Sequence, residues 1–351
     1  MTPALNRRRA LQTLFCSSAA LALNLSRQTQ AAVAGDGLHL LAIGDFGTGA
    51  ADQKAVSKAM QDFVQQHQMK PEALLLVGDN FYGPAEPRPK VPKGKKSGTP
   101  PNPLFTVTSK RWQTDIEQMY PEAAFPCPMY AVLGNHDYHD NLGGEQTQLA
   151  YSKKGGTRWK MPAKWYRQDF GSREKPLLTV LFLDSNLREV SGRDSKTKKF
   201  TRPSLTAEEG EAQLAWLKAE LAKPRAPFTL VVAHHPVYSN GDHGDTKPLI
   251  EQWEPLLQEH HVHAYLCGHD HDLQHLELEG RFTSHILSGG GGARTRALEG
   301  ADKRKMPYGK AVHGFTHITV QPGSVTFAHH GVDGTLLHQF VKHLDGRVEI
   351  G

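Results

Sequence analysis

The stretch Gly78-Asp79-Asn80-Phe81-Tyr82 decides the fold, because it directly follows the apolar run Ala-Leu-Leu-Leu-Val at residues 73–77. An uncharged run of that length, ended by a glycine, is typical of a strand buried on both faces of a parallel sheet. Asp79 would then lie just beyond the carboxyl end of the strand, the edge at which open α/β sheets bind ligands. The sequence therefore predicts an α/β fold with a site that includes Asp79.

Four other apolar runs, at residues 38–43, 129–133, 228–233 and 264–266, end in a similar way. Each is followed by side chains that can bind a metal: Gly44-Asp45, Gly134-Asn135-His136-Asp137, His234-His235 and Cys267-Gly268-His269-Asp270-His271. A single Asp, Asn or His after a strand is ordinary turn chemistry. It is unusual for five strands to end in such residues, so we expect these side chains to gather at one sheet edge.

The types of these residues indicate the kind of site. Carboxylate, amide, imidazole and phenol groups favour a hard or borderline metal over a thiolate zinc site. There are more candidate ligands than one ion needs, which points to two ions that share a carboxylate. Two ions about 3.5–4 Å apart can polarise a phosphoryl oxygen and lower the pKa of a bound water.

In order and spacing, the chain resembles the five-block signature of the calcineurin-like metallophosphoesterases. The blocks are Gly44-Asp45-Phe46-Gly47, Gly78-Asp79-Asn80-Phe81-Tyr82, Gly134-Asn135-His136-Asp137, Ala233-His234-His235-Pro236 and Gly268-His269-Asp270-His271. Tyr82 makes the chain similar to the purple acid phosphatases in particular. Stretches such as Gln213-Leu214-Ala215-Trp216-Leu217-Lys218 resemble their small tartrate-resistant type, and the likeness extends from residue 38 to about residue 342.

This resemblance implies a site for Fe³⁺ and a second, divalent ion, which would be Fe²⁺, Zn²⁺ or Mn²⁺. The implied ligands of Fe³⁺ are Asp45, Asp79, Tyr82 (as phenolate) and His271. The implied ligands of the divalent ion are Asp79, which bridges the two, and Asn135, His234 and His269. His136 and His243 would lie outside the ligand shell and contact the substrate. Asp137 is expected to orient His136, because a carboxylate partner fixes the tautomer of an imidazole.

The resemblance also implies a four-layer αββα sandwich of two mixed β-sheets flanked by helices. The implied activity is that of an acid phosphatase, which hydrolyses small phosphate monoesters by attack of a metal-bound hydroxide. Two alternatives stay open. The same metal core serves phosphodiesterases that act on nucleotides or lipid headgroups, and a catalytically silent metal- or phosphate-binding protein is the alternative outside enzymes.

Some features depart from the family pattern. Ala233 stands where the small type usually has Gly, and His235 where it usually has Tyr. Two basic stretches, residues 84–104 and 193–202, are expected to be insertion loops. They are either solvated or, if they rim the site, able to raise the local concentration of anionic substrate.

Residues 1–34 are expected to be an export signal, followed by one metallophosphoesterase domain at residues 35–351. Arg7-Arg8-Arg9 precede a modest apolar run at 11–25, and Ala32-Val33-Ala34 is a small-x-small cleavage pattern. The order Arg8-Arg9-Ala10-Leu11-Gln12 resembles a twin-arginine signal. The run is too short and too polar for a stable membrane anchor. We therefore expect the twin-arginine machinery to export the protein to the periplasm or beyond.

Loss of that segment changes the charge of the chain. Residues 1–34 contain four of the 41 Lys and Arg residues and none of the 36 Asp and Glu residues. The rest of the chain therefore has 37 basic and 36 acidic residues and is close to neutral. The basic pI of the whole chain is therefore no argument for a role on nucleic acid.

The rest of the chain alternates strands with amphipathic helices. Helices are predicted at residues 52–68, 111–119, 146–151, 207–223 and 247–260, and Thr206 with Glu209 is a capping box for the fourth. Strands are predicted at 165–170 and 177–184. The β runs at 283–288, 315–320, 324–329 and 335–341 predict a second sheet, antiparallel in its later part, packed on the first.

Three further expectations concern residues outside the blocks. Cys127 and Cys267 are expected at opposite sheet edges, too far apart for a disulfide. Gly289–Gly292 could cradle a phosphate with their N–H groups or form a plain loop. Five histidines without a matching block are expected at the surface or at helix ends: His260, His261, His263, His329 and His330.

Overall fold

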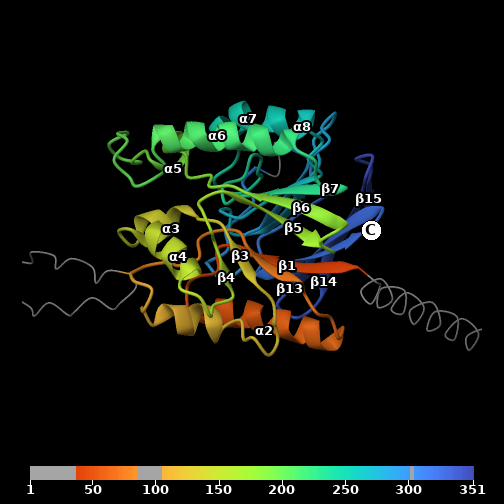
Figure 1. Cartoon of the computed structure of the whole chain (residues 1–351), viewed down its shortest axis with the longest axis horizontal. Coiled ribbons are helices and arrows are strands. Elements are labelled where there is room, and N and C mark those ends of the chain that lie inside the picture. Colours follow the sequence, from red (N-terminus) through yellow and green to blue (C-terminus); the bar gives the residue numbers. More distant parts are fainter. Residues whose placement is uncertain (1–36, 85–104, 301–303) are drawn as a thin grey trace, which may run out of the picture.

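The computed structural model describes residues 37–84, 105–300 and 304–351 (Figure 1). The export signal predicted at residues 1–34 and nearly all of the basic stretch 84–104 lie outside these ranges. Within the described ranges, none of the helices has the length and apolar character needed to cross a membrane.

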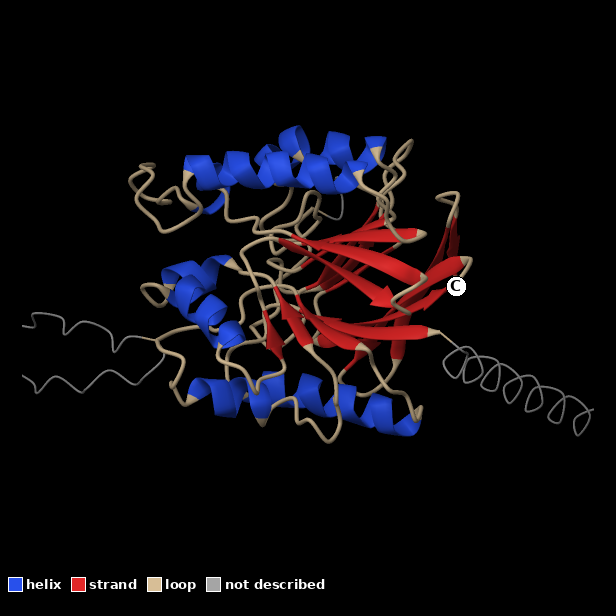
Figure 2. Cartoon of the chain, viewed as in Figure 1, coloured by secondary structure: helices blue, strands red, loops and turns tan. Residues whose placement is uncertain are grey.

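The chain folds into four layers, as predicted. Two mixed β-sheets pack face to face, and helices cover their outer faces (Figure 2). Helix α2 (Ala51–Gln66) covers one sheet, and α6 (Ala207–Ala222), α7 (Lys247–Gln252) and α8 (Glu254–Glu259) cover the other (Figure 1). In this arrangement a central strand is buried on both faces, and β7 (Phe228–Val232) is an example. Its Leu230 lies in the core between the sheets, and its Val231 packs toward the helices.

The first sheet has the strand order β15-β14-β13-β12-β1-β2-β3-β4. Its parallel part consists of β1 (Leu38–Ile43), β2 (Ala73–Leu76), β3 (Met129–Ala131) and β4 (Trp159–Lys160). Its antiparallel part consists of β12 (Gly314–Gln321), β13 (Ser324–Gly331), β14 (Leu336–His343) and β15 (Val348–Ile350).

The second sheet has the order β11-β9-β10-β8-β7-β6-β5. Besides β7, its strands are β5 (Tyr166–Gly171), β6 (Pro176–Phe182), β8 (Ala264–Cys267), β9 (Leu273–Leu276), β10 (Ser284–Ser288) and β11 (Tyr308–Lys310). The remaining helices are the π-helix η1 (Trp112–Glu117), α3 (Asn135–His139), α4 (Gly144–Lys153) and α5 (Arg188–Ser191).

The predicted division of strands between the sheets is wrong. Strands β12–β15 extend the first sheet, because β1 pairs with β2 on one side and antiparallel with β12 on the other, so that Ala42 lies opposite both Leu75 and Thr316. Strands β6, β7 and β8 belong to the second sheet. The strands that precede the metal-binding motifs therefore come from two sheets, and their side chains do not share one sheet edge.

The predicted helices are present, with two differences. The segment predicted as one helix at 247–260 is two short helices that meet at Trp253, because a proline occupies the first turn of each. The segment at 111–119 is a π-helix. The capping box is confirmed, since the Glu209 N–H donates to Thr206 Oγ1 at 3.1 Å.

The histidine prediction is wrong for His263, His329 and His330, which are buried. Their positions pack against the core, where the ring of His330 stacks on Phe315 and His329 Nδ1 lies 2.9 Å from Thr316 Oγ1. His260 ends α8 and His261 is exposed, as predicted. Both described cysteines, Cys127 and Cys267, are free.

Of the two possibilities for the glycine run 289–292, the structure favours the plain loop. A Cβ on Gly289 would lie 2.0 Å from the carbonyl oxygen of Asp270, and one on Gly291 would lie 2.3 Å from that of Gly44. The N–H groups of these two glycines donate to the carbonyls of Asp272 and Gly44. The run therefore allows the loops after β1, β8 and β10 to pack closely.

Candidate metal centre

Two buried carboxylates mark the centre of the site. Asp45 and Asp79 follow β1 and β2, and their exposed fractions are 0% and 1%. Both have left-handed backbones, with φ of 57° and 52°. Such a conformation costs a residue with a Cβ on the order of 1–3 kcal/mol and concentrates at functional sites. The strained backbone at Asp45 and Asp79 thus places two buried carboxylates side by side.

Glycines let loops of neighbouring strands reach these carboxylates. A Cβ on Gly134 would lie 2.1 Å from Asp79 Oδ1, and one on Gly268 would lie 2.3 Å from Asp45 Oδ2. The N–H of His136 donates to Asp79 Oδ1 and that of His269 to Asp45 Oδ2, both at 2.9 Å. The second bond joins the two sheets, since Asp45 follows β1 and His269 follows β8.

The four residues predicted to hold Fe³⁺ lie together. Tyr82 Oη is 3.1 Å from Asp45 Oδ1 and 3.1 Å from His271 Nε2, and Asp45, Asp79 and His271 present ligand atoms within 4.8 Å of one another. His271 Nδ1 lies 2.9 Å from the carbonyl oxygen of Arg294, to which it can only donate. Its Nε2 lone pair is therefore directed into the group.

The residues predicted to hold the divalent ion lie beside them. His234 Nε2 is 3.2 Å from Asn135 Oδ1, 3.3 Å from His269 Nδ1 and 3.4 Å from Asp79 Oδ1. His234 Nδ1 donates to the carbonyl of Val77 at 3.0 Å, so Nε2 is the nitrogen that faces the group, with a lone pair once the ring loses its second proton. Acceptor atoms that face one another at these distances fit a cation between them.

The electrostatics of the centre are consistent with bound cations. Burial raises the pKa of Asp45 well above its usual value, and His234 only partly offsets this effect. Burial opposes the charging of His234, yet the charge of Asp79 raises the pKa of His234 to about 9. Burial lowers the pKa of His271 to about 4 and that of His269 well below its usual value, so both imidazoles are neutral near neutral pH.

Tyr82 needs a cation of high charge to ionise. Burial raises the pKa of Tyr82 well above 10, and the carboxylates of Asp45 and Asp79 raise it further. A phenolate at this position therefore requires a strong Lewis acid beside it.

The predicted orienting role of Asp137 is wrong, because Asp140 holds His136. His136 Nδ1 is 2.8 Å from Asp140 Oδ2, one turn along α3. Burial opposes a charge on His136, but the hydrogen bond to Asp140 raises its pKa overall. The His136 side chain is 34% exposed, and its ring lies 4.4 Å from that of Tyr82. His136 thus borders the site from the Tyr82 side.

Asp137 instead holds the loops on which the ligands lie. Its carboxylate accepts hydrogen bonds from the backbone N–H groups of Gly134, Asn80 and Phe81 and from the side chain of Gln148. It therefore ties the motif after β2 to the motif after β3.

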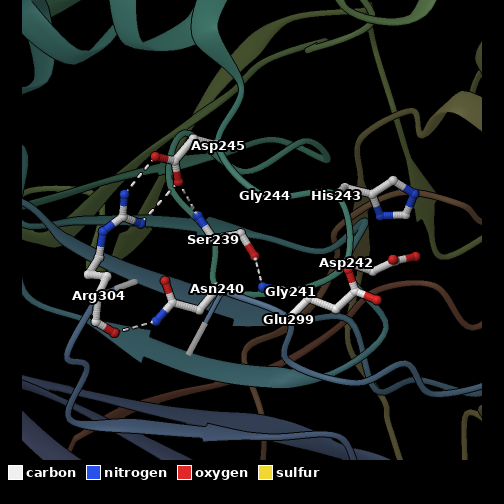
Figure 3. Close-up of a pocket in the computed structure, with 10 residues that line it drawn as sticks. Ser239, Asn240, Gly241, Asp242, His243, Gly244, Asp245, Glu299 and Arg304 are labelled. Carbon is white, nitrogen blue, oxygen red and sulfur yellow. Dashed lines mark hydrogen bonds and ion pairs between the residues drawn. The ribbon is translucent and has the colours of Figure 1, made fainter. Parts of the chain in front are cut away.

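His243 borders the opposite side of the site. Its Nδ1 lies 2.8 Å from Asp270 Oδ1, and its ring centroid is 4.1 Å from that of His269. The loop 239–245 that carries it lines a pocket of about 310 Å³ (Figure 3). An ion pair of Asp245 with Arg304, at 3.0 and 2.6 Å, fixes this loop (Figure 3).

Sequence reasoning assigned no role to four residues at the site, although His235 and Asp270 lie in its motifs. Asp140 and Asp270 position His136 and His243, Arg296 places its guanidinium 3.0 Å from His243 Nε2, and His235 joins His234 and His269 in a group of converging imidazoles. The i,i+4 spacing of His136 and Asp140 would have revealed that pair if a helix had been predicted there. Arg296 follows no motif, and only the folded chain reveals it.

Comparisons with known proteins agree with this geometry. The model of the calcineurin-like phosphoesterase family matches residues 38–273. Rabbit (Oryctolagus cuniculus) tartrate-resistant acid phosphatase type 5 is 30% identical over 317 residues, covering 86% of this chain and 89% of that protein. Purple acid phosphatase 7 of Arabidopsis thaliana is 26% identical over 314 residues, covering 86% of this chain and 85% of that protein.

Two solved structures share the fold. GAP50, described as the anchor in the inner membrane complex of Plasmodium, has a TM-score of 0.68 at 20% identity and covers 86% of this chain and 87% of its own. The purple acid phosphatase PPD1 of yellow lupin (Lupinus luteus) has a TM-score of 0.61 at 15% identity and covers 88% of this chain and 54% of its own.

Proposed function

This chain belongs to the calcineurin-like phosphoesterase family, close to its tartrate-resistant acid phosphatases, and we propose that it is a binuclear-metal acid phosphatase acting on small phosphate monoesters. The observation that carries the proposal is the convergence of two groups of metal-binding atoms on Asp79, with His136 and His243 on either side.

The proposed ions are Fe³⁺ and a divalent ion (Fe²⁺, Zn²⁺ or Mn²⁺). The proposed ligands of Fe³⁺ are Asp45, Asp79, Tyr82 and His271, and those of the divalent ion are Asp79, Asn135, His234 and His269. When bound, such a pair acidifies water and neutralises charge on phosphoryl oxygens.

The side chains of the protein supply orientation and protons. Asp140 holds Nδ1 of His136, which leaves its Nε2 to contact a phosphate ester. Asp270 holds Nδ1 of His243, whose Nε2 lies 3.0 Å from the guanidinium of Arg296, so that His243 and Arg296 would meet the ester together. His136 Nε2 would donate a proton to the departing oxygen, the step that an alkoxide leaving group needs most.

A substrate panel tests the function. Purified protein should hydrolyse phenyl phosphate with a higher kcat/KM than diphenyl phosphate, and chelation should abolish both activities until ions are restored. A higher kcat/KM for the diester would favour the phosphodiesterase alternative. A metal-loaded protein that turns over neither compound would instead be the silent binding protein.

Colour tests the iron ligand. A Tyr82 phenolate on Fe³⁺ should give a charge-transfer band in the visible spectrum, and Tyr82→Phe should remove the band while iron is retained. Tyr138→Phe is the matched control, because Tyr138 is buried and donates to Asp184 away from the ligands. An iron-loaded wild-type protein without colour would contradict the assignment.

We further propose that residues 1–34 direct export through the twin-arginine machinery. The proposal rests on Arg8-Arg9 and on the apolar run and cleavage pattern that follow. Arg8→Lys with Arg9→Lys should hold the precursor in the cytoplasm, as fractionation would show. Wild-type amounts of mature protein outside would point to another route.

A further inference from the structure

An open pocket of about 510 Å³ adjoins the metal centre on the side of the divalent ion. Asn135 and His269, two of its proposed ligands, line this pocket together with His243. The opposite wall comes from α5, the basic loop 193–202 and the start of α7. Figure 1 shows α5 and the loop after it on the same side of the molecule as α3, which carries Asn135. A substrate phosphate at the centre would thus have its remaining part beside this loop.

The pocket has a surplus of positive charge. Arg193, Arg202 and Lys247 line it, whereas its acidic residues are Glu189 and Asp245. Arg304 already neutralises Asp245 through the two contacts drawn in Figure 3. Arg202 and Lys247 also have acidic neighbours outside the pocket, Asp194 at 3.8 Å and Glu251 at 3.6 Å, but water screens both of these partly exposed contacts. Among the residues that line the pocket, Glu189 is thus the carboxylate that remains beside the three cations.

The basic loop is a folded element that fixes its arginines. Asp194 Oδ1 accepts from the N–H groups of Lys196 and Thr197 at 3.1 and 2.7 Å, which closes the turn. Arg193 and Phe200 form an antiparallel bridge, and the Arg193 guanidinium lies 4.9 Å from the centre of the Phe200 ring. The N–H of Arg202 donates to the carbonyl of Gly192 at 3.0 Å. The backbone of the loop is thus ordered at both arginines, which line the pocket although their side chains are exposed.

We propose that Arg193, Arg202 and Lys247 form a second anion subsite, so that the preferred substrates are phosphate monoesters that carry another anionic group, a phosphate or carboxylate. This inference rests on the proposed phosphatase function. Arginine binds such oxyanions through paired N–H donors, and the contact is stronger than one between neutral groups. The metal centre would hold the phosphate to be cleaved, while the subsite would hold the second group.

Matched substrates test the subsite. The monophosphates and bisphosphates of unbranched diols with three, four and six carbons differ only in the second phosphate, and the series samples its distance from the first. Wild-type protein should show a higher kcat/KM for at least one bisphosphate than for its monophosphate. In Arg193→Ala with Arg202→Ala, the ratio of the two values should fall about tenfold, as expected for the loss of charge-assisted hydrogen bonds.

The same loop offers the control. Lys196→Ala with Lys199→Ala removes the same amount of charge from residues that do not line the pocket, and should leave the ratio unchanged. Arg202→Lys should lower the ratio less than Arg202→Ala. Turnover of the monophosphate reports that each variant is folded.

Two results would overturn the subsite. One is an unchanged ratio in the double arginine variant, and the other is an equal fall in the double lysine variant, which would indicate general attraction by the loop. Wild-type protein that hydrolyses neither kind of substrate would overturn the proposed function, and the subsite with it.

Discussion

Asp79→Asn should remove both ions from the protein and lower kcat/KM for phenyl phosphate by on the order of 10³-fold or more. Asp79 belongs to the group with Asp45 and His271, and its Oδ1 also lies 3.4 Å from His234 Nε2 of the other group. Asparagine tolerates the left-handed backbone at this position, and its amide oxygen can still accept the N–H of His136. The substitution therefore removes the charge while it retains the shape.

Metal analysis of the purified variant is the decisive measurement. Asp184→Asn is the matched control, because Asp184 is also a fully buried carboxylate but bonds to Tyr138 and Asn186 instead of to proposed ligands. This control should retain both ions. An Asp79→Asn protein with two ions and wild-type turnover would refute the bridging role.

The positions of the proposed ligands were predictable because each depends on a local pattern. Asp45 and Asp79 each follow a buried strand and a glycine, and the direction of a strand fixes the end at which its loop emerges. Whether strands β1 and β7 share one sheet depends on pairings between distant segments. The apolar runs alone do not contain that information, since both strands are buried on both faces.

The partners and surroundings of other histidines were less predictable. Asp137 and Asp140 are both close to His136 in sequence, and the choice between them depends on α3, whose first turn directs Asp137 back to the N–H of Gly134. His329 and His330 follow one another in β13, and both are buried because both faces of the strand are covered: the ring of His330 packs on Phe63 of α2, and His329 Nε2 lies 3.2 Å from the carbonyl of Gln274 in β9. Such details follow from packing and not from composition.

His136→Ala should leave both ions in place and lower turnover of alkyl phosphates by on the order of 10²–10⁴-fold. The structure places its imidazole beside Tyr82, with Nδ1 on Asp140, so its removal deletes a proton donor and no proposed ligand. An alkoxide leaves slowly unless it is protonated, whereas a nitrophenolate is already stable. The penalty should therefore be largest for alkyl phosphates and small for 4-nitrophenyl phosphate.

Three comparisons separate this role from others. Asn135→Ala should lower the occupancy of the divalent ion together with the rate, since Asn135 Oδ1 faces His234 Nε2. Asp140→Asn should give a milder loss with the same dependence on the leaving group, because Asp140 acts on the reaction through His136; an asparagine oxygen can still accept the N–H of Gly83, as Asp140 Oδ2 does. His243 is the rival donor, so the double variant should lose little beyond the worse single one if both act as a unit. Loss of metal in His136→Ala, or an equal penalty for good and poor leaving groups, would show that His136 is not the acid.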